Sequence, residues 1–237
     1  MKNKQLQNKP WIFFDLDDTL IPSSFLYEKA YQKLSLHHDL LFKKAKESVK
    51  NQLPKGHTSA HSRLLYFKKY LELKRKFSAE SLLQLNTAYE NFFLKSLSLF
   101  IENQDLKSQL KTLKKHFHLA LITNENCRTQ ILKVNCIDPK GLLFDKIITS
   151  EEVGVEKPKN KIFEVLFADI KLESSKFSKK SHYLIGDSYE NDYLPGLKFG
   201  LTPILTTEFK NDLLHRKINT SKMKVICSLA DFSGRFL

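Results

Sequence analysis

Hydrophobic and polar positions follow two different rhythms along this chain. Short apolar runs separated by amphipathic stretches occur near the N-terminus and again after residue 104, whereas residues 22–100 show helical periodicity alone. A short apolar run that ends on polar residues predicts a buried strand, and apolar residues spaced three or four positions apart predict a helix packed on one face. The pattern therefore predicts an α/β core interrupted by a helical segment.

Strands and helices alternate in the predicted core. The first strand is residues 11–14, a run of bulky side chains that favour extended backbone. Further strands are predicted at residues 118–122, 144–148, 182–185, 202–205 and 224–227, and helices at 105–117, 128–134, 159–170 and 191–199, with a terminal helix opening at 228–231. This alternation predicts a Rossmann-like, mostly parallel and doubly wound sheet.

The helical segment is interpreted as about four helices with a loop in the middle. Leu64, Phe67 and Leu71 share one helical face, and Ser78 precedes a further apolar stripe, as a helix-capping residue does. Residues 53–58 contain a proline and a glycine, the strongest helix breakers. We therefore expect two domains, a catalytic core of residues 1–20 and 101–237 and a helical domain of residues 21–100.

Polar clusters stand at or near the ends of the predicted strands. Their members are Asp15, Asp17, Asp18, Thr123, Asn124, Lys157, Asp187 and Asp192. Taken alone, the three acids after the first strand could equally form a strand-to-helix turn, since Asp and Thr are ordinary turn and capping residues. The carboxyl ends of parallel strands share one edge of the sheet, where ligand crevices lie, so these residues can converge.

The residue types in this set suit phosphoryl transfer with a metal ion. Several carboxylates in one crevice repel one another unless a cation lies among them, and hard oxygen ligands suit Mg²⁺. A lysine and a hydroxyl can hold the other oxygens of a phosphoryl group. Two acids at positions i and i+2 allow one carboxylate to attack phosphorus while the other moves a proton.

Four motifs of this chain resemble, in order and spacing, those of the haloacid dehalogenase (HAD) superfamily. They are Asp15-Leu16-Asp17-Asp18-Thr19, Thr123-Asn124, Lys157-Pro158, and Gly186-Asp187-Ser188 with Asp192. The helical segment resembles the C1-type cap of that superfamily, and the likeness runs from Trp11 to about Leu205. The stretch at residues 150–158 is similar to the phosphatase branch that includes nucleotidases and sugar-phosphate phosphatases.

This resemblance implies a role for each catalytic motif. Asp15 would be the nucleophile, and Asp17 would be the general acid and base. Thr123 and Asn124 would bind phosphoryl oxygens, and Lys157 would orient and neutralise both nucleophile and phosphate. The dehalogenases that give the superfamily its name lack the second acid, because a halide leaves without a proton. Asp17 therefore favours phosphate chemistry.

The resemblance also implies a magnesium site. The Asp15 carboxylate, the Asp17 backbone carbonyl and Asp187 would hold Mg²⁺, and Asp192 would assist directly or through water. We therefore expect a Mg²⁺-dependent phosphomonoester hydrolase that acts on a small phosphorylated metabolite, a nucleotide or a sugar phosphate, through an aspartyl-phosphate intermediate. A phosphomutase would use the same intermediate and is the alternative within the superfamily.

Substrate choice is expected to come from residues 54–63 of the helical domain. In relatives with this kind of cap, a loop between the cap helices reaches over the site. The segment is rich in groups compatible with phosphate and ribose, and the candidates are His57, His61 and Arg63. The plainer interpretation is a polar loop followed by a helix that Thr58 or Ser59 caps.

A net charge of +13 and a pI near 9.5 suggest a different class of partner, one that carries negative charge. Lysine and arginine residues gather at 68–69, 74–76 and 176–180, and such charge suits nucleic acid, an anionic membrane or phosphorylated small molecules. A basic nucleic-acid-binding or regulatory protein with a vestigial site is therefore the alternative from another class. Aromatic and basic residues are not interleaved along one strand face, which makes a nucleic acid partner the weaker expectation.

The cysteines and the N-terminal segment bear on the cellular compartment. Cys127, Cys136 and Cys227 are too few and too scattered for a disulfide framework or a zinc site. Residues 1–9 and the short apolar run after them do not resemble a secretory signal, and no stretch approaches the roughly 20 apolar residues of a membrane span. We expect a cytoplasmic protein with no membrane partner.

Overall fold

A computed structural model describes residues 9–170, 182–215 and 223–236. The lysine cluster at 176–180 and all but the last residue of the N-terminal segment 1–9 lie outside these described residues. Within the described part of the chain, no helix combines the length and the hydrophobicity of a membrane-spanning segment.

A six-stranded parallel sheet forms the core, with the strand order β3-β2-β1-β4-β5-β6. The strands are β1 (Trp11–Phe14), β2 (His118–Thr123), β3 (Lys146–Thr149), β4 (Tyr183–Gly186), β5 (Thr202–Thr206) and β6 (Val225–Ile226). β1 lies between β2 and β4, where Phe14 is opposite both Leu121 and Ile185. The order of the strands reverses at β1, and ligands of such sheets bind at this switch point. The predicted doubly wound parallel sheet is confirmed.

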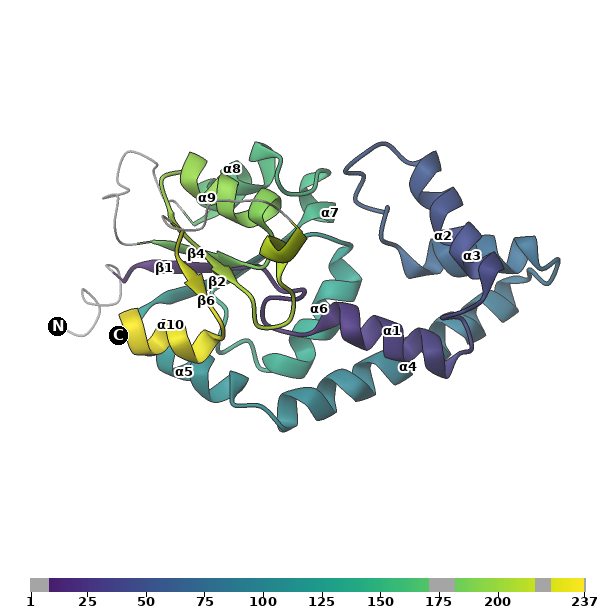
Figure 1. The fold of residues 1–237 in the computed structure, drawn as a ribbon, viewed down its shortest axis with the longest axis horizontal. Helices are drawn as coiled ribbons and strands as arrows, with labels where there is room; N and C mark the ends of the chain where they lie inside the picture. Colours follow the sequence, from purple (N-terminus) through teal and green to yellow (C-terminus); the bar gives the residue numbers. More distant parts are fainter. Residues whose placement is uncertain (1–8, 171–181, 216–222, 237) are drawn as a thin grey trace.

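Helices cover both faces of the sheet (Figure 1). They are α5 (Leu106–His116), α6 (Cys127–Ile137), α7 (Ser150–Val153), α8 (Asn160–Asp169), α9 (Leu194–Lys198) and α10 (Leu229–Phe236). Phe14 packs in one apolar cluster with residues of α5, α6 and α10, and Phe13 packs in another with residues of α8. Neighbouring residues of a strand point to opposite faces, so a centrally placed β1 needs apolar side chains throughout.

Four helices form the segment between β1 and α5. They are α1 (Ser23–Lys33), α2 (Leu40–Gln52), α3 (Arg63–Leu73) and α4 (Ala79–Glu102). An aromatic cluster joins them, with ring centroids 5.0 Å apart for Tyr31 and Phe42 and 5.2 Å apart for Phe67 and Tyr89. α4 runs from this cluster back to the core, where it contacts α6 (Figure 1). The predicted helices are confirmed, whereas the division into domains at residues 20 and 100 stays a prediction.

The start of α3 differs from one interpretation of the sequence. The hydroxyl of Ser62 accepts a hydrogen bond from the N–H of Leu65 at 3.5 Å, which makes Ser62 the N-cap. The interpretation in which Thr58 or Ser59 caps this helix is wrong, because both residues lie in turns that precede it. Ser78 caps α4 as predicted.

The predicted helix at 191–199 is irregular. One turn of π-helix, Tyr189–Tyr193, leads into the short α9. The N–H of Tyr193 donates to the carbonyl of Ser188, five positions back, and Pro195 has no N–H with which to continue a regular ladder. Such wide turns are frequent at functional sites, and this one lies at the carboxyl edge of the sheet.

Candidate active site

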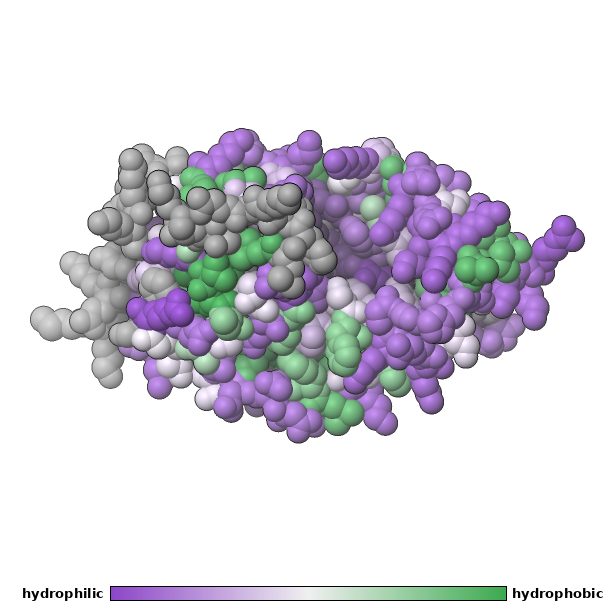
Figure 2. Space-filling view, viewed as in Figure 1, coloured by the Kyte–Doolittle hydropathy of each residue, from purple (hydrophilic) through white to green (hydrophobic). Residues whose placement is uncertain are grey.

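A cleft of about 290 Å³ lies between the carboxyl edge of the sheet and the helical segment. Figure 2 shows a hollow lined by hydrophilic residues between these two parts of the molecule. All of the predicted site residues except His57 line this cleft: Asp15, Asp17, His61, Arg63, Thr123, Asn124, Lys157, Asp187 and Asp192. The convergence expected from a parallel sheet is therefore observed.

Asp15 follows β1 directly and is held at both its backbone and its side chain. Its N–H donates to the carbonyl of Ile185 at 2.9 Å. One carboxylate oxygen accepts a hydrogen bond from the Lys157 ammonium at 2.8 Å, and the other lies 3.4 Å from the Thr19 hydroxyl. Burial raises the pKa of Asp15 above its ordinary value, against the attraction of Lys157. Lys157 thus fixes one oxygen, while the contact of the other oxygen with Thr19 is long.

Lys157 connects its own motif with the other three. Its buried ammonium lies 2.8 Å from Asp15 Oδ1 and 2.6 Å from Asp192 Oδ1. Burial alone would lower the pKa of Lys157, but these two carboxylates raise it well above its ordinary value. The amide of Asn124 accepts from the Lys157 N–H at 2.8 Å and donates to its carbonyl at 3.4 Å. The side chain of Asn124 therefore positions Lys157, and its predicted contact with phosphate stays a prediction.

Asp192 approaches the end of β4 closely because residue 186 is glycine. A Cβ at Gly186 would overlap the side chain of Asp192, so the acid could not occupy this position beside any other residue. Burial raises the pKa of Asp192 to about 6, although Lys157 opposes the shift. The fourth motif thus requires glycine at position 186 because a larger residue would displace Asp192.

Three buried carboxylates form a group that could hold a metal ion. One oxygen from each of Asp15, Asp187 and Asp192 lies within 4.8 Å of the others. Burial raises the pKa of Asp187, which accepts a hydrogen bond from Lys210 at 2.8 Å. Closely spaced carboxylate oxygens are ligands that Mg²⁺ prefers. The residues present therefore fit the predicted magnesium site, and Lys210 is a neighbour that no motif indicated.

Asp17 lies in the cleft, but its carboxylate turns toward α6. It accepts hydrogen bonds from Gln130 Nε2 at 2.8 Å, from Lys133 Nζ at 2.6 Å and from the Ser23 hydroxyl. Burial would raise the pKa of Asp17, but Lys133 and the hydrogen bonds from Gln130, Lys133 and Ser23 together hold it below its ordinary value. The predicted acid and base is therefore held as a carboxylate by residues outside the four motifs.

Glu125, which none of the four motifs contains, joins α3 to this group. Its φ of 90° lies in the left-handed region, which residues other than glycine rarely adopt. Its buried carboxylate pairs with the guanidinium of Arg63 and lies 3.3 Å from the ammonium of Lys133. Arg63 also lies over the ring of Tyr27, 3.8 Å from its centroid. A chain of charges thus runs from Arg63 through Glu125 and Lys133 to Asp17.

The sequence held only a weak signal for these partners of Asp17. Gln130 and Lys133 are three positions apart on a helix that follows Thr123 closely, so they share the face that turns toward the strand end. A lysine on such a helix is ordinarily exposed, whereas the exposed fraction of Lys133 is 0%. Only the folded arrangement shows which acids compensate its charge.

The predicted substrate residues differ in how they lie relative to the cleft. Arg63 lines it and is fixed by Glu125. His61 also lines it, with Nε2 4.0 Å from the Glu156 carboxylate, and burial lowers the pKa of His61 to about 4. His57 accepts a hydrogen bond from the N–H of Ser59 at 3.1 Å and does not line the cleft. The substrate roles of all three stay predictions.

Comparison with known proteins places this arrangement in a family. The sequence profile described as haloacid dehalogenase-like hydrolase matches residues 12–205, from β1 to β5. The chain belongs to the haloacid dehalogenase-like hydrolases. The superfamily predicted from the four motifs is therefore confirmed.

Two curated proteins and a solved structure resemble this HAD-like hydrolase. The ribulose-1,5-bisphosphate 5-phosphatase of Halopiger xanaduensis is 28% identical over 209 residues, which cover 82% of this chain and 83% of that protein. Pyrimidine 5'-nucleotidase YjjG of Escherichia coli is 35% identical over 97 residues, 40% of each protein. The structure of 2-haloacid dehalogenase from Pseudomonas syringae has a TM-score of 0.63 at 20% identity, covering 95% of this chain and 97% of that one.

These relatives confirm the predicted enzyme class, a hydrolase of the phosphatase kind. The dehalogenase shares the fold of this chain at low sequence identity, so the fold alone does not choose the reaction. The reaction depends on the residues of the cleft, which include Asp17 as a second acid.

Proposed function

We propose that this HAD-like hydrolase is a Mg²⁺-dependent phosphomonoesterase that works through an aspartyl-phosphate on Asp15. The observation that carries the proposal is the meeting of a lysine-bound Asp15, a second acid and a three-carboxylate group in one cleft. The similarity to a 5-phosphatase and a 5'-nucleotidase supports the same class of reaction. The substrate is then a small phosphorylated metabolite, a sugar phosphate or a nucleotide.

In the first step, the carboxylate oxygen of Asp15 that Lys157 does not bind attacks phosphorus. The bond from phosphorus to the leaving oxygen breaks, and Asp17 gives that oxygen a proton, which its carboxylate takes up from water once it has left Lys133 and Gln130. Lys157 neutralises charge on the nucleophile and on the transferred group. Phosphoryl transfer depends mainly on such positioning and neutralisation, which the buried lysine is placed to supply.

In the second step, Asp17 takes a proton from water as the water oxygen attacks phosphorus. The bond between phosphorus and Asp15 breaks, which releases phosphate and restores the carboxylate. Asp17 has to rotate from α6 toward Asp15 for both proton transfers. Gln130 contacts the Asp17 carboxylate and also donates to the Thr123 hydroxyl at 2.8 Å, so one amide joins the acid to a predicted phosphate-binding residue.

Asp15, Asp187 and Asp192, with the backbone carbonyl of Asp17, would hold Mg²⁺. When bound, the ion would supply positive charge for the phosphoryl oxygens. The three acids outnumber the ammonium groups of Lys157 and Lys210 that contact them, so a further cation suits the site.

Chelation of divalent cations with EDTA is expected to lower phosphate release from p-nitrophenyl phosphate by at least about a hundredfold, and added Mg²⁺ should restore it. Without a cation, the three carboxylates repel the phosphate dianion.

Asp187→Asn should raise the Mg²⁺ concentration that gives half-maximal activity. The matched Asp169→Asn, which changes an exposed acid of α8 paired with Lys146, should not. Full activity after exhaustive chelation would contradict the proposal, and steady net release of phosphate separates it from the phosphomutase alternative.

Lys133→Met is expected to lower kcat by about tenfold to a hundredfold, because it removes the cation that orients the Asp17 carboxylate. It also leaves the buried Glu125 and the partly buried Asp17 without this partner, so thermal unfolding should be measured alongside the rate. Lys146→Met is the matched control, since Lys146, at the start of β3, pairs with the exposed Asp169 of α8. Equal rates for the two folded variants would show that Lys133 does not position Asp17.

A further inference from the structure

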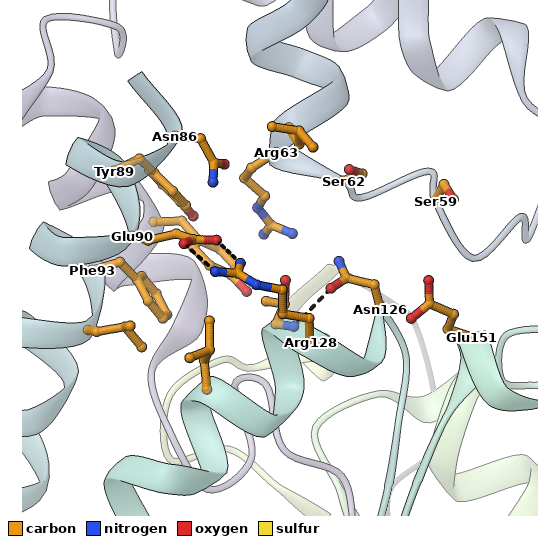
Figure 3. Close-up of a pocket in the computed structure, with 15 residues that line it drawn as sticks. Ser59, Ser62, Arg63, Asn86, Tyr89, Glu90, Phe93, Asn126, Arg128 and Glu151 are labelled. Carbon is orange, nitrogen blue, oxygen red and sulfur yellow. Dashed lines mark hydrogen bonds and ion pairs between the residues drawn. The ribbon is translucent and has the colours of Figure 1, made fainter. Parts of the chain in front are cut away.

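A second cavity, of about 250 Å³, lies beside the catalytic cleft, between the helical segment and the core. Tyr27 and Arg63 line both spaces and form the wall between them. Figure 3 shows the cavity with Asn86 and Tyr89 of α4 on one side and Arg128 of α6 on the other. A substrate whose phosphate reaches Asp15 would therefore meet this cavity just beyond the shared wall.

One wall of the cavity is aromatic. Tyr27, Tyr89 and Phe93 line it, and the rings of Tyr27 and Phe93 stack with centroids 5.0 Å apart. Aromatic faces favour flat, apolar ligand surfaces, on which they bury much area at little cost in conformational entropy. The cavity thus suits a planar ring better than a flexible polar chain.

A polar side chain of α4 faces the same space. Asn86 lines the cavity, and Figure 3 shows its side-chain amide directed into it. A side-chain amide can both donate and accept hydrogen bonds. The amide of Asn86 therefore suits a ring with hydrogen-bonding edges.

The charges of the lining argue against a second phosphate. The guanidinium of Arg63 pairs with Glu125, and that of Arg128 forms two hydrogen bonds with Glu90, one of them at 2.9 Å. Glu151 adds a further carboxylate to the lining. Each arginine in this part of the described chain is thus already neutralised, whereas a buried phosphate requires uncompensated cations or several free donors.

We propose that this cavity receives the outer part of the substrate's leaving group and that this part is an uncharged, planar, hydrogen-bonding ring. The substrate class is then a nucleoside 5'-monophosphate, with the base in the cavity and the sugar beside Tyr27 and Arg63. A sugar bisphosphate would place its second phosphate against paired arginines and an extra acid, and is disfavoured. This inference rests on the proposed function, because it assumes that the phosphate lies at Asp15.

The first test compares substrates and variants by kcat/KM with Mg²⁺. Wild-type protein should hydrolyse uridine 5'-monophosphate faster than ribulose 1,5-bisphosphate. Asn86→Ala should lower the ratio of uridine monophosphate to p-nitrophenyl phosphate hydrolysis by about tenfold, the loss of one buried hydrogen bond. Asn91→Ala, a matched change at an exposed position of the same helix, should leave that ratio unchanged. A preference for the bisphosphate, or equal ratios for the two variants, would overturn the inference while leaving the phosphatase intact.

The second test does not depend on turnover. Calorimetry should show that the Asp15→Asn protein binds uridine 5'-monophosphate. Adding Asn86→Ala should raise the dissociation constant about tenfold, and adding Asn91→Ala should leave it unchanged. Failure of every hydrolysis assay would reject the proposed function, yet this binding difference would still support the cavity. No binding, or binding that Asn86→Ala leaves unchanged, would reject the cavity as the base site.

Discussion

The Asp15→Asn variant is expected to release phosphate from p-nitrophenyl phosphate at least about 10⁴-fold more slowly than the wild-type protein. A neutral amide does not attack phosphorus, so the aspartyl-phosphate does not form. The substitution hardly changes the size of the side chain, and the backbone N–H of residue 15 keeps its bond to Ile185. Phosphate release with Mg²⁺, measured beside circular dichroism and thermal unfolding, checks the prediction.

Asp169→Asn is the matched control for this substitution. Asp169 lies at the end of α8 and pairs with Lys146 on the surface, so its change to an amide should leave the rate at the wild-type level. A folded Asp15→Asn protein with activity within about tenfold of wild type would exclude Asp15 as the nucleophile. It would also exclude an aspartyl-phosphate at this position.

The Asp17→Asn variant is expected to lose about 10³-fold in kcat, because both proton transfers need its carboxyl group. The two steps can be separated by the choice of leaving group. p-Nitrophenolate leaves without a proton, so the first step should persist with p-nitrophenyl phosphate and give a burst of about one p-nitrophenolate per enzyme before turnover nearly stops. An alkyl phosphate, whose oxygen must be protonated, should give no burst.

Rapid-mixing measurements with both substrates check this division of roles. If Asp17→Asn turned over p-nitrophenyl phosphate steadily and without a burst, Asp17 would not be the base of the second step. If it hydrolysed an alkyl phosphate at the wild-type rate, Asp17 would not be the acid of the first. Lys133→Met should show a weaker form of the same defect, because Lys133 contacts the same carboxylate at 2.6 Å.

The sheet and the motif acids could be predicted from the sequence because their signals are local. β1 is a continuous apolar run, and its position between β2 and β4 buries both faces. The acids follow strand ends directly, so parallel-sheet topology alone brings Asp15 and Asp187 to one edge. Irregular backbone was harder to predict. The predicted helix at 191–199 contains Pro195, and the chain forms a π-turn before it.

The partners of Asp17 could not be predicted because they depend on distant parts of the chain. Lys133 and Asp17 are 116 residues apart, and Glu125 and Arg63 are 62 residues apart. Spacing on α6 indicates only that Lys133 and Gln130 share a face. The cavity beside the cleft depends in the same way on how α4 and α6 meet, which no motif describes.

The covalent phosphoryl group is the most direct test of the central claim. Asp17→Asn protein would be mixed with p-nitrophenyl phosphate and Mg²⁺, quenched in acid, digested and analysed by mass spectrometry. The proposed mechanism predicts one phosphoryl group on the peptide that contains Asp15, and none in an Asp15→Asn/Asp17→Asn control. A phosphoryl group on another residue, or p-nitrophenolate release with no protein-bound phosphoryl group, would contradict it.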